Sequence, residues 1–278
     1  MKRLLTLLIG VTPLPLLAQW QVTAIGGIAN YQGDLQEKRF TTSQSHGAFG
    51  LGLQYDFTSR LSARGGLAYG RVSGDDKLAK DSFLVARNLN FTSQVLEGHL
   101  MAEYRFLDLD SKKFTPYVFA GIAVFGFDPY TWDTSGVKRF LQPLTTEGVA
   151  YSRVQLALPF GGGIKLKVND RLSLGYEIGL RKTFTDRLDD LSDRYVDEAQ
   201  LLAARGATAV ELAYRGDELK DGNLVYPAAG TIRGGPDVKD WYYFQGITLT
   251  YRLEKFFFGN RESGSSSDRQ LDCPRNVY

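Results

Sequence analysis

Most of the chain between residues 20 and 253 alternates apolar side chains with small or polar ones at a period of two. In residues 47–57, for example, Phe49, Leu51 and Leu53 alternate with Gly50 and Gly52. The same alternation recurs in residues 61–70, 96–106, 156–168, 172–184 and 241–253. Two further segments are less regular: residues 20–32 alternate only at their start, and residues 114–127 are apolar on both faces. A period of two is that of a β-strand with one apolar face, so the pattern predicts eight strands.

The connections between these segments alternate between short and long. Short polar turns cover residues 58–60, 108–113 and 169–171, whereas the long connections cover residues 33–46, 73–90, 128–154 and 185–240. Outer-membrane barrels have short periplasmic turns, long outer loops and tilted strands of about ten residues. We therefore predict an all-β fold, an eight-stranded antiparallel transmembrane β-barrel in the outer membrane. A soluble β-sandwich or a lipocalin-like barrel is the alternative, but it has no reason to sort its loops in this way.

Three segments with different roles are expected along the chain. Residues 1–18 have two basic residues, an apolar stretch and a terminal Ala, which together predict a secretory signal peptide; a buried first helix is the alternative. Residues 19–253 form the barrel, and residues 254–278, with Gly264 and three following serines, are expected to be a flexible periplasmic tail. Beyond residue 18 no apolar run is long enough for a transmembrane helix.

Charge and cysteine content exclude several classes of protein. Without Lys2 and Arg3, the chain carries equal numbers of basic and acidic residues, so no basic surface for nucleic acid is expected. The single cysteine, Cys273, excludes a zinc ribbon and an intramolecular disulfide. A lone thiol in an exported tail predicts either a disulfide with a periplasmic partner, which we favour, or a free thiol. Cys273 is the only site residue predicted from the sequence, as a partner contact.

The predicted strand faces also locate aromatic and charged side chains. Aromatic residues at strand ends are expected to form girdles at the membrane interfaces; they are Trp20, Tyr55, Phe57, Tyr69, Tyr104, Phe106, Phe125, Phe127, Trp241, Tyr242 and Tyr251. A barrel of eight strands has room inside only for side chains. Its inner face carries Arg64, Glu97, His99, Glu103, Arg105, Lys165, Lys167, Glu177, Arg181 and Arg252. Buried charges must be paired, so we expect a closed salt-bridge network with neither a pore nor a substrate cavity.

The two histidines and a dense group of loop carboxylates are the candidates for catalytic or metal-binding chemistry. His99 is expected to belong to the internal network and His46 to be solvated, so no catalytic residue, cofactor or small-molecule substrate is predicted. A dense group of carboxylates in the last long loop suggests either a Ca²⁺ site or, as we favour, a solvated self-paired surface. Its members are Asp186, Asp189, Asp190, Asp193, Asp197 and Glu198. Residues 196–220 have a helical composition broken at Gly206, which predicts one or two short helices over the barrel mouth. The glycines of residues 161–163 are expected to relieve crowding in the wall.

Six stretches, in order and spacing, resemble a known family. They are residues 30–35 (NYQGDL), 64–70 (RGGLAYG) with 73–76 (SGDD), 115–121 (TPYVFAG), 159–165 (PFGGGIK), 181–186 (RKTFTD) and 239–242 (KDWY). Together they resemble the PorG-type outer-membrane barrels of Bacteroidetes, which belong to the type IX protein secretion system, over nearly all of residues 20–253. The resemblance implies a non-catalytic accessory barrel rather than the translocation pore.

The resemblance also implies partners. Members of that family associate with a periplasmic ring made of a lipoprotein and a second subunit, and help to tether it to the outer membrane. We therefore expect outer-membrane lipids and such ring proteins as partners, with the tail of residues 254–278 at the junction. Two alternatives remain: an autonomous barrel, of an adhesin or envelope-stabilising type, acting through its 185–240 loop, and a lipid-modifying barrel enzyme.

Overall fold

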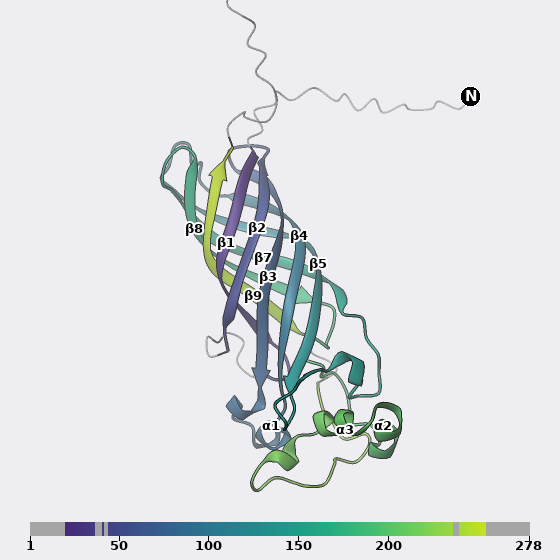
Figure 1. Ribbon diagram of the computed structural model, residues 1–278. Helices are drawn as coiled ribbons and strands as arrows, with labels where there is room; N and C mark the ends of the chain where they lie inside the picture. The colour runs from purple at the N-terminus through teal and green to yellow at the C-terminus, as the bar shows by residue number, and fades with distance from the viewer. Residues whose placement is uncertain (1–19, 37–40, 42–43, 236–238, 254–278) are drawn as a thin grey trace, which may run out of the picture.

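The computed structural model describes residues 20–36, 41, 44–235 and 239–253. The predicted signal peptide and the tail of residues 254–278, including Cys273, lie outside the described residues. The described chain forms a closed barrel with long loops gathered at one end (Figure 1). No described helix is long and apolar enough to cross a bilayer.

The wall contains eight strands that pair antiparallel in chain order. They are β1 (Trp20–Gln32), β2 (His46–Asp56), β3 (Leu61–Asp75), β4 (Asn90–Arg105), β5 (Phe114–Trp132), β7 (Val154–Lys167), β8 (Leu172–Thr183) and β9 (Trp241–Arg252). The barrel closes where β1 pairs with β9, from Gln21 opposite Arg252 to Gln32 opposite Trp241. A short strand, β6 (Lys138–Phe140), pairs only with the outer end of β5. The predicted eight-stranded antiparallel barrel is confirmed.

Each short turn is stabilised by a side-chain oxygen at its start. The Thr58 hydroxyl accepts hydrogen bonds from the amides of Arg60 and Leu61. The Asn169 side-chain oxygen accepts bonds from the amides of the second and third residues after it, at 2.9 and 2.8 Å, and Asp108 accepts one from the amide of Asp110. Asn, Asp and Thr form such local turns readily. The three turns lie at the end opposite the long loops, as the connection lengths predicted.

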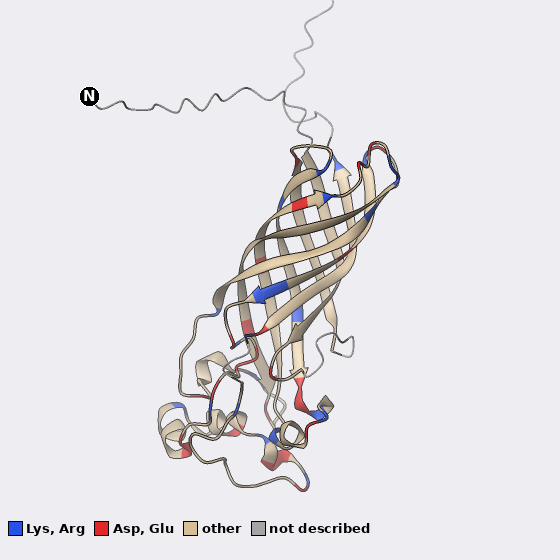
Figure 2. Ribbon diagram, turned by 180° about the vertical axis from the view of Figure 1, so that it is seen from behind, with Lys and Arg blue, Asp and Glu red and all other residues tan. Residues whose placement is uncertain are grey.

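The outer wall is apolar, as the alternation of the strands requires. Leu51, Leu67, Ile122 and Ile247 are each more than 60% exposed on it. Lys, Arg, Asp and Glu are sparse along the wall and gather in the loops and short turns (Figure 2). Side chains of this kind are stable against lipid, and the closed ladder leaves no unpaired strand edge in the bilayer. The molecule is an outer-membrane barrel.

The predicted aromatic girdle is correct for the turn end and wrong for part of the loop end. Trp20, Tyr55 and Phe57 form a chain of edge-to-face contacts outside the turn end, with ring centroids about 5 Å apart. By contrast, Phe125, Phe127 and Tyr242 point inward and are almost fully buried. In β5 the odd positions face the interior, and the sequence pattern hides this because that strand is apolar on both faces.

Glycines let the strands pack closely, as expected for residues 161–163. A Cβ atom on Gly161 would overlap the backbone oxygen of Ile178, and one on Gly163 would overlap that of Tyr176. Both positions lie between neighbouring strands with no room for a side chain. The glycines therefore serve the wall and form no phosphate loop.

The long loops fold into a cap over one barrel mouth. We define the cap as residues 33–36, 76–89, 133–153, 184–235 and 239–240. Its helices are α1 (Ser82–Arg87), α2 (Glu198–Arg205) and α3 (Ala207–Ala213), with short 3₁₀ turns at Asp76–Leu78, Gln142–Leu144 and Gly216–Glu218. The helices predicted in residues 196–220 are confirmed, and Gly206, at φ +86°, separates α2 from α3.

Candidate functional site: a sealed barrel beneath a folded cap

The turn-side half of the interior is filled by ion pairs. Arg64 makes a two-point contact with Glu177, at 2.7 and 3.1 Å, and Tyr117 donates a third hydrogen bond to the same carboxylate at 2.8 Å. Lys165 pairs with Glu103 alongside. These side chains are at most 6% exposed. Charged groups buried away from water are stable only when they are paired. The pairing of these side chains therefore explains how this half of the interior can contain charges.

A second set of contacts lies nearer the cap, around Glu97. Arg181 binds this carboxylate at 3.0 and 3.2 Å, and Tyr242 donates to it at 2.7 Å. His99 contacts the same carboxylate through Nδ1 at 3.0 Å. His99 therefore lies in the internal network, as predicted, and the expected salt-bridge network is confirmed for the buried members. Lys167 and Arg252 were also predicted there, but they are half-buried at the turn end and pair with Asp170 and Asp110.

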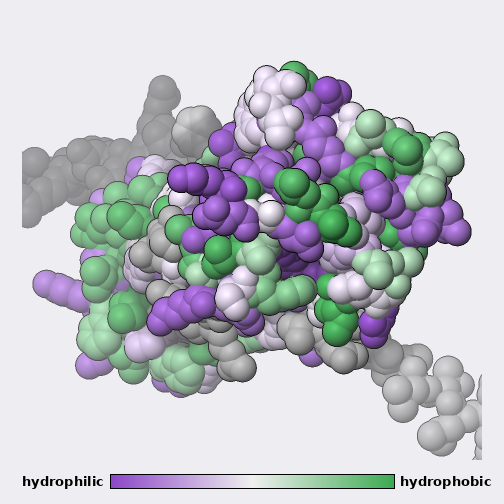
Figure 3. Space-filling model, turned by 90° about the horizontal axis from the view of Figure 1, so that it is seen from below, coloured by the Kyte–Doolittle hydropathy of each residue, from purple (hydrophilic) through white to green (hydrophobic). Residues whose placement is uncertain are grey.

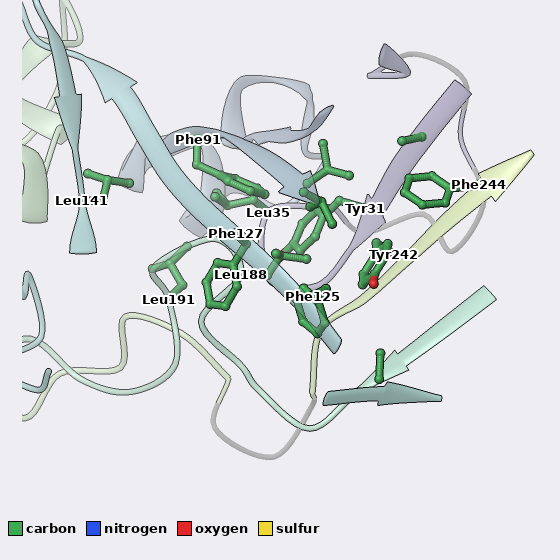
Figure 4. Packing of buried hydrophobic residues seen from close by; sticks show 14 of the residues in the cluster. Tyr31, Leu35, Phe91, Phe125, Phe127, Leu141, Leu188, Leu191, Tyr242 and Phe244 are labelled. Atoms are coloured by element: carbon green, nitrogen blue, oxygen red, sulfur yellow. The ribbon is translucent and has the colours of Figure 1, made fainter. Parts of the chain in front are cut away.

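An aromatic plug fills the barrel between this network and the cap. We use this name for Tyr31, Phe91, Phe125, Phe127, Tyr242 and Phe244, all at most 3% exposed. Figure 4 shows these rings converging from different strands, together with Leu35 and Leu188 from the cap. Phe125 and Tyr242 contact each other with centroids 5.1 Å apart. The interior is thus closed by charge pairs on one side and by rings on the other.

The turn end, in contrast, is open to a cavity of about 290 Å³. Its lining consists of Asp56, Phe57, Thr58, Ser59, Arg105, Asp108, Leu109, Asp110 and Arg252. Arg105 pairs with Asp56 at 2.9 Å, and Arg252 lies 3.6 Å from Asp110. The Nε atom of Arg105 is buried without a hydrogen-bond partner. This mouth therefore presents charges of both signs next to the last residues of β9.

The cap is held together by buried arginines that bridge different loops. Arg87 pairs with Asp76 through two contacts of 2.8 Å and also donates to the backbone oxygen of Arg233. Arg233 pairs with Glu147 at 3.0 Å and donates to two further carbonyl groups. Arg187 binds the other oxygen of Glu147 at 3.0 Å. These contacts join three of the four long loops into one folded unit.

The acidic loop is not the solvated surface that the sequence suggested. Asp186, Asp189 and Asp190 are at most 4% exposed, whereas Asp193 and Asp197 are exposed. Burial, together with the neighbouring carboxylate of Asp34, raises the pKa of Asp186 to about 7. These acids are buried because Leu188 and Leu191 enter the apolar cluster and draw the neighbouring acids under the cap.

The buried acids do not form a recognisable metal centre. Among the described residues, no group of three or more His, Cys, Asp or Glu side chains is arranged to hold a metal ion. Asp190 instead accepts hydrogen bonds from the hydroxyls of Thr146 and Tyr151, at 2.5 and 2.7 Å. The carboxylates are thus stabilised by hydroxyl and amide donors as well as by cations.

His46 is not merely solvated, which corrects the sequence prediction. Its Nε2 atom lies 2.8 Å from the hydroxyl of Ser73, and both residues are half-buried at the loop end of the barrel. A catalytic histidine also requires a group that orients its second ring nitrogen. Within the described chain no carboxylate hydrogen-bonds to His46, and the charge near it is the cation Arg71.

Sequence reasoning missed Tyr31, Asp34, Arg233 and Asp240. Tyr31, Asp34 and Asp240 lie in stretches that carry the family resemblance, but none of the four residues matches a spacing that points to a site. The weak signal available was an Asp two residues after β1 and another directly before β9, because these strands become neighbours only when the barrel closes.

The chain was compared with known families and structures. A model of the family described as a domain of unknown function, DUF6089, matches residues 2–203. No curated protein matches the chain.

Several solved barrels are similar over most of their length. The chain is 11% identical to Neisserial surface protein A, covering 84% of this chain and 97% of that one with a TM-score of 0.42. It is 14% identical to a major outer membrane protein of Thermus thermophilus, with coverages of 85% and 99% and a TM-score of 0.43. Likeness at this level carries no argument about what the chain binds or does.

Proposed function

The chain belongs to the DUF6089 family, and from this premise and the geometry above we propose that it is a non-catalytic outer-membrane anchor of a protein secretion machine. In this proposal the machine is of the type IX kind, and the barrel tethers a periplasmic ring to the membrane. The resemblance of residues 20–253 to PorG-type barrels supplies the identity of the machine. The closed interior supplies the physical argument.

The single observation that supports an anchor is that the barrel interior is filled from the pair of Arg64 and Glu177 to the aromatic plug beneath the cap. Opening a passage would require separating Arg64 from Glu177 and Arg181 from Glu97, and removing the rings of the plug. Breaking even one buried pair costs about 3–5 kcal/mol. A conduit or a carrier for small molecules is therefore disfavoured, and a role through contacts at the two ends is favoured.

The turn end is the candidate contact for the periplasmic ring. Its cavity of about 290 Å³ is lined by both acids and bases, and the chain leaves β9 beside it. Polar surfaces of mixed charge with a few buried groups suit a specific protein contact. The proposed disulfide of Cys273 would add a covalent link at this side.

The experiment is a non-reducing pull-down of the full chain from native outer membranes, followed by mass spectrometry. We expect a periplasmic lipoprotein and a second ring subunit to co-purify, with a reducible adduct that is lost in the Cys273→Ser variant. Deletion of residues 260–278 is expected to weaken recovery of the ring. A monomer that brings down no ring protein in any form contradicts the proposal.

A second candidate is an autonomous barrel that acts through its cap. The outer face of the cap mixes polar and apolar residues (Figure 3). Leu224 and Val225 are 82% and 69% exposed there, which favours a contact outside the cell. Replacing both residues with serine is expected to leave recovery of the ring unchanged; loss of an outer ligand with the ring intact would favour this second role.

A further inference from the structure

One buried hydroxyl beneath the cap contacts two carboxyl groups. The hydroxyl of Tyr31, at the loop end of β1, binds Oδ2 of Asp189 and lies 3.2 Å from Oδ1 of Asp240. All three residues are at most 2% exposed. A tyrosine hydroxyl has one proton and donates one hydrogen bond, so it satisfies one of the two carboxylates. The other contact is a hydrogen bond only if that carboxyl group is protonated and donates to the tyrosine oxygen.

The remaining carboxyl oxygens are already occupied by backbone amides. Oδ1 of Asp189 accepts a hydrogen bond from the amide of Leu191 at 2.9 Å, and Oδ2 of Asp240 accepts one from the amide of Leu188 at 2.9 Å. A Cβ atom on Gly33 would overlap both the Tyr31 hydroxyl and the Asp240 carboxyl group. Neither carboxyl group can therefore turn away from the hydroxyl without breaking a backbone contact.

The charges around this triad do not neutralise it. Asp34 beside β1 and Asp186 in the loop after β8 add negative charge. Of the nearby cations, Arg87 is paired with Asp76, and Arg187 and Arg233 are paired with Glu147. Lys239 approaches Asp186 at 3.9 Å. Among the described residues, no Lys or Arg forms an ion pair with Asp189 or Asp240.

We propose that one proton, shared by Asp189 and Asp240 through the hydroxyl of Tyr31, fastens both ends of the 185–240 loop to the barrel mouth, and that its loss releases the loop. Asp189 follows β8, and Asp240 immediately precedes β9. Tyr31 belongs to β1, which pairs with β9 on one side and with β2 on the other. Without the proton, two carboxylates compete for one donor beside Asp34 and Asp186. The cap is thus a pH-sensitive part of an otherwise rigid barrel, independently of which partner it meets.

The direction of the pH dependence follows from the proton count. Burial, and after it the charge of Asp34, raises the pKa of Asp189 well above its usual value; burial and Asp189 do the same for the pKa of Asp240. In an open loop both carboxyl groups meet water and ionise near pH of about 4. Opening therefore releases a proton above that pH, and the opening constant rises about tenfold per pH unit until the closed form also loses its proton.

Hydrogen exchange of the full chain in detergent micelles, followed by mass spectrometry between pH 5 and 8, tests the proposal. After correction for the intrinsic exchange rate, peptides covering residues 186–192 are expected to open at least tenfold more per pH unit, with Asp186 adding to the slope below pH 7, while peptides of β4 show no such change. In Asp189→Asn the amide donates permanently to Tyr31, and its oxygen still accepts from Leu191. The slope should fall by one proton, a factor of about ten per pH unit, in this variant and in Asp240→Asn, and only the contribution of Asp186 below pH 7 should remain.

Asp193→Asn is the matched control, because it removes the same charge from an exposed position of the same loop. Its opening should follow the wild type. A wild-type opening constant that does not change with pH overturns the proposal, as does an unchanged slope in a folded Asp189→Asn or Asp240→Asn variant. Closure by millimolar Ca²⁺ at pH 8, abolished in Asp189→Asn, would overturn it too, since the acids would then bind a cation rather than a proton. None of these outcomes bears on the proposed tether.

Discussion

Two regions of this molecule bury many charges, and they balance them differently. Inside the barrel each carboxylate faces its own cation: Glu177 with Arg64, Glu103 with Lys165, Glu97 with Arg181 and Asp56 with Arg105. In the cap the acids outnumber the cations, and hydroxyls and amides complete their coordination. A region with matched charges tolerates changes of pH, whereas a region with excess acid responds to them. The stability of the barrel interior is therefore expected to change little with pH, whereas the stability of the cap is expected to depend on it.

The largest effect is expected from breaking the balance inside the barrel. Glu97→Ala leaves Arg181 buried without its partner and removes the acceptor of Tyr242 and His99. The free energy of unfolding should fall by about 3–5 kcal/mol, measured by urea unfolding in lipid vesicles. Asp193→Ala, which removes an exposed carboxylate, serves as the control. A Glu97→Ala barrel as stable as the control would show that the pair contributes nothing.

A smaller and more local effect is expected from Arg233 in the cap. Arg233→Met removes the bond to Glu147 and the bonds to two carbonyl groups while keeping much of the apolar stem. Cap opening should become easier by about 1.5–3 kcal/mol, the range for hydrogen bonds to charged groups, and barrel stability should stay the same. Limited proteolysis at the exposed Arg194 and Lys220 measures the first quantity. Simultaneous loss of protection in β3 and β4 would mean that cap and barrel unfold together.

Replacing the carboxylate of Asp186 is expected to stabilise the cap, in contrast to the two substitutions above. Both of its carboxyl oxygens are buried without a hydrogen-bond partner, and its pKa is raised to about 7. A raised pKa means that the closed cap loses stability as the pH rises from about 4 towards 7. Asp186→Asn removes that loss, so at pH 8 hydrogen exchange in residues 186–192 should slow by at least tenfold, and by up to about a thousandfold for the full rise of the pKa from about 4 to about 7. At pH 4 the variant and the wild type should exchange alike; a difference there would point to packing rather than charge.

The smallest effect is expected at the pair of Ser73 and His46. Ser73→Ala removes one half-buried hydrogen bond and should change the free energy of unfolding by at most about 1 kcal/mol. Because the proposed role is non-catalytic, the variant should recover the periplasmic ring as well as the wild type does. An acyl-chain change in outer-membrane lipids that depends on Ser73 would instead favour the lipid-modifying alternative.

The barrel could be predicted because its pattern is local. A side chain in a strand faces inward or outward according to the parity of its position, so the lipid face and the ion-pair network follow from counting residues. Assigning faces from odd and even positions fails where both sets of positions are apolar. In β5 it placed Phe125 and Phe127 in the outer girdle, although both belong to the aromatic plug. The turns were predictable for a related reason, since Thr58, Asp108 and Asn169 bond to amides only two or three residues away.

The sequence by itself determined the strands, the faces of those that alternate, the short turns, most of the charges that meet inside the barrel and the helices near residue 206. Only the tertiary structure decided that Asp186, Asp189 and Asp190 are buried and that Tyr31 joins Asp189 to Asp240. The contacts of Tyr31 span 158 and 209 residues and exist because the barrel closes β1 onto β9. The sheet repeats the alternation of inward and outward side chains along the chain, and this alternation can be counted in the sequence. The contacts of the cap depend on which loops meet when the barrel closes, and the alternation does not predict them.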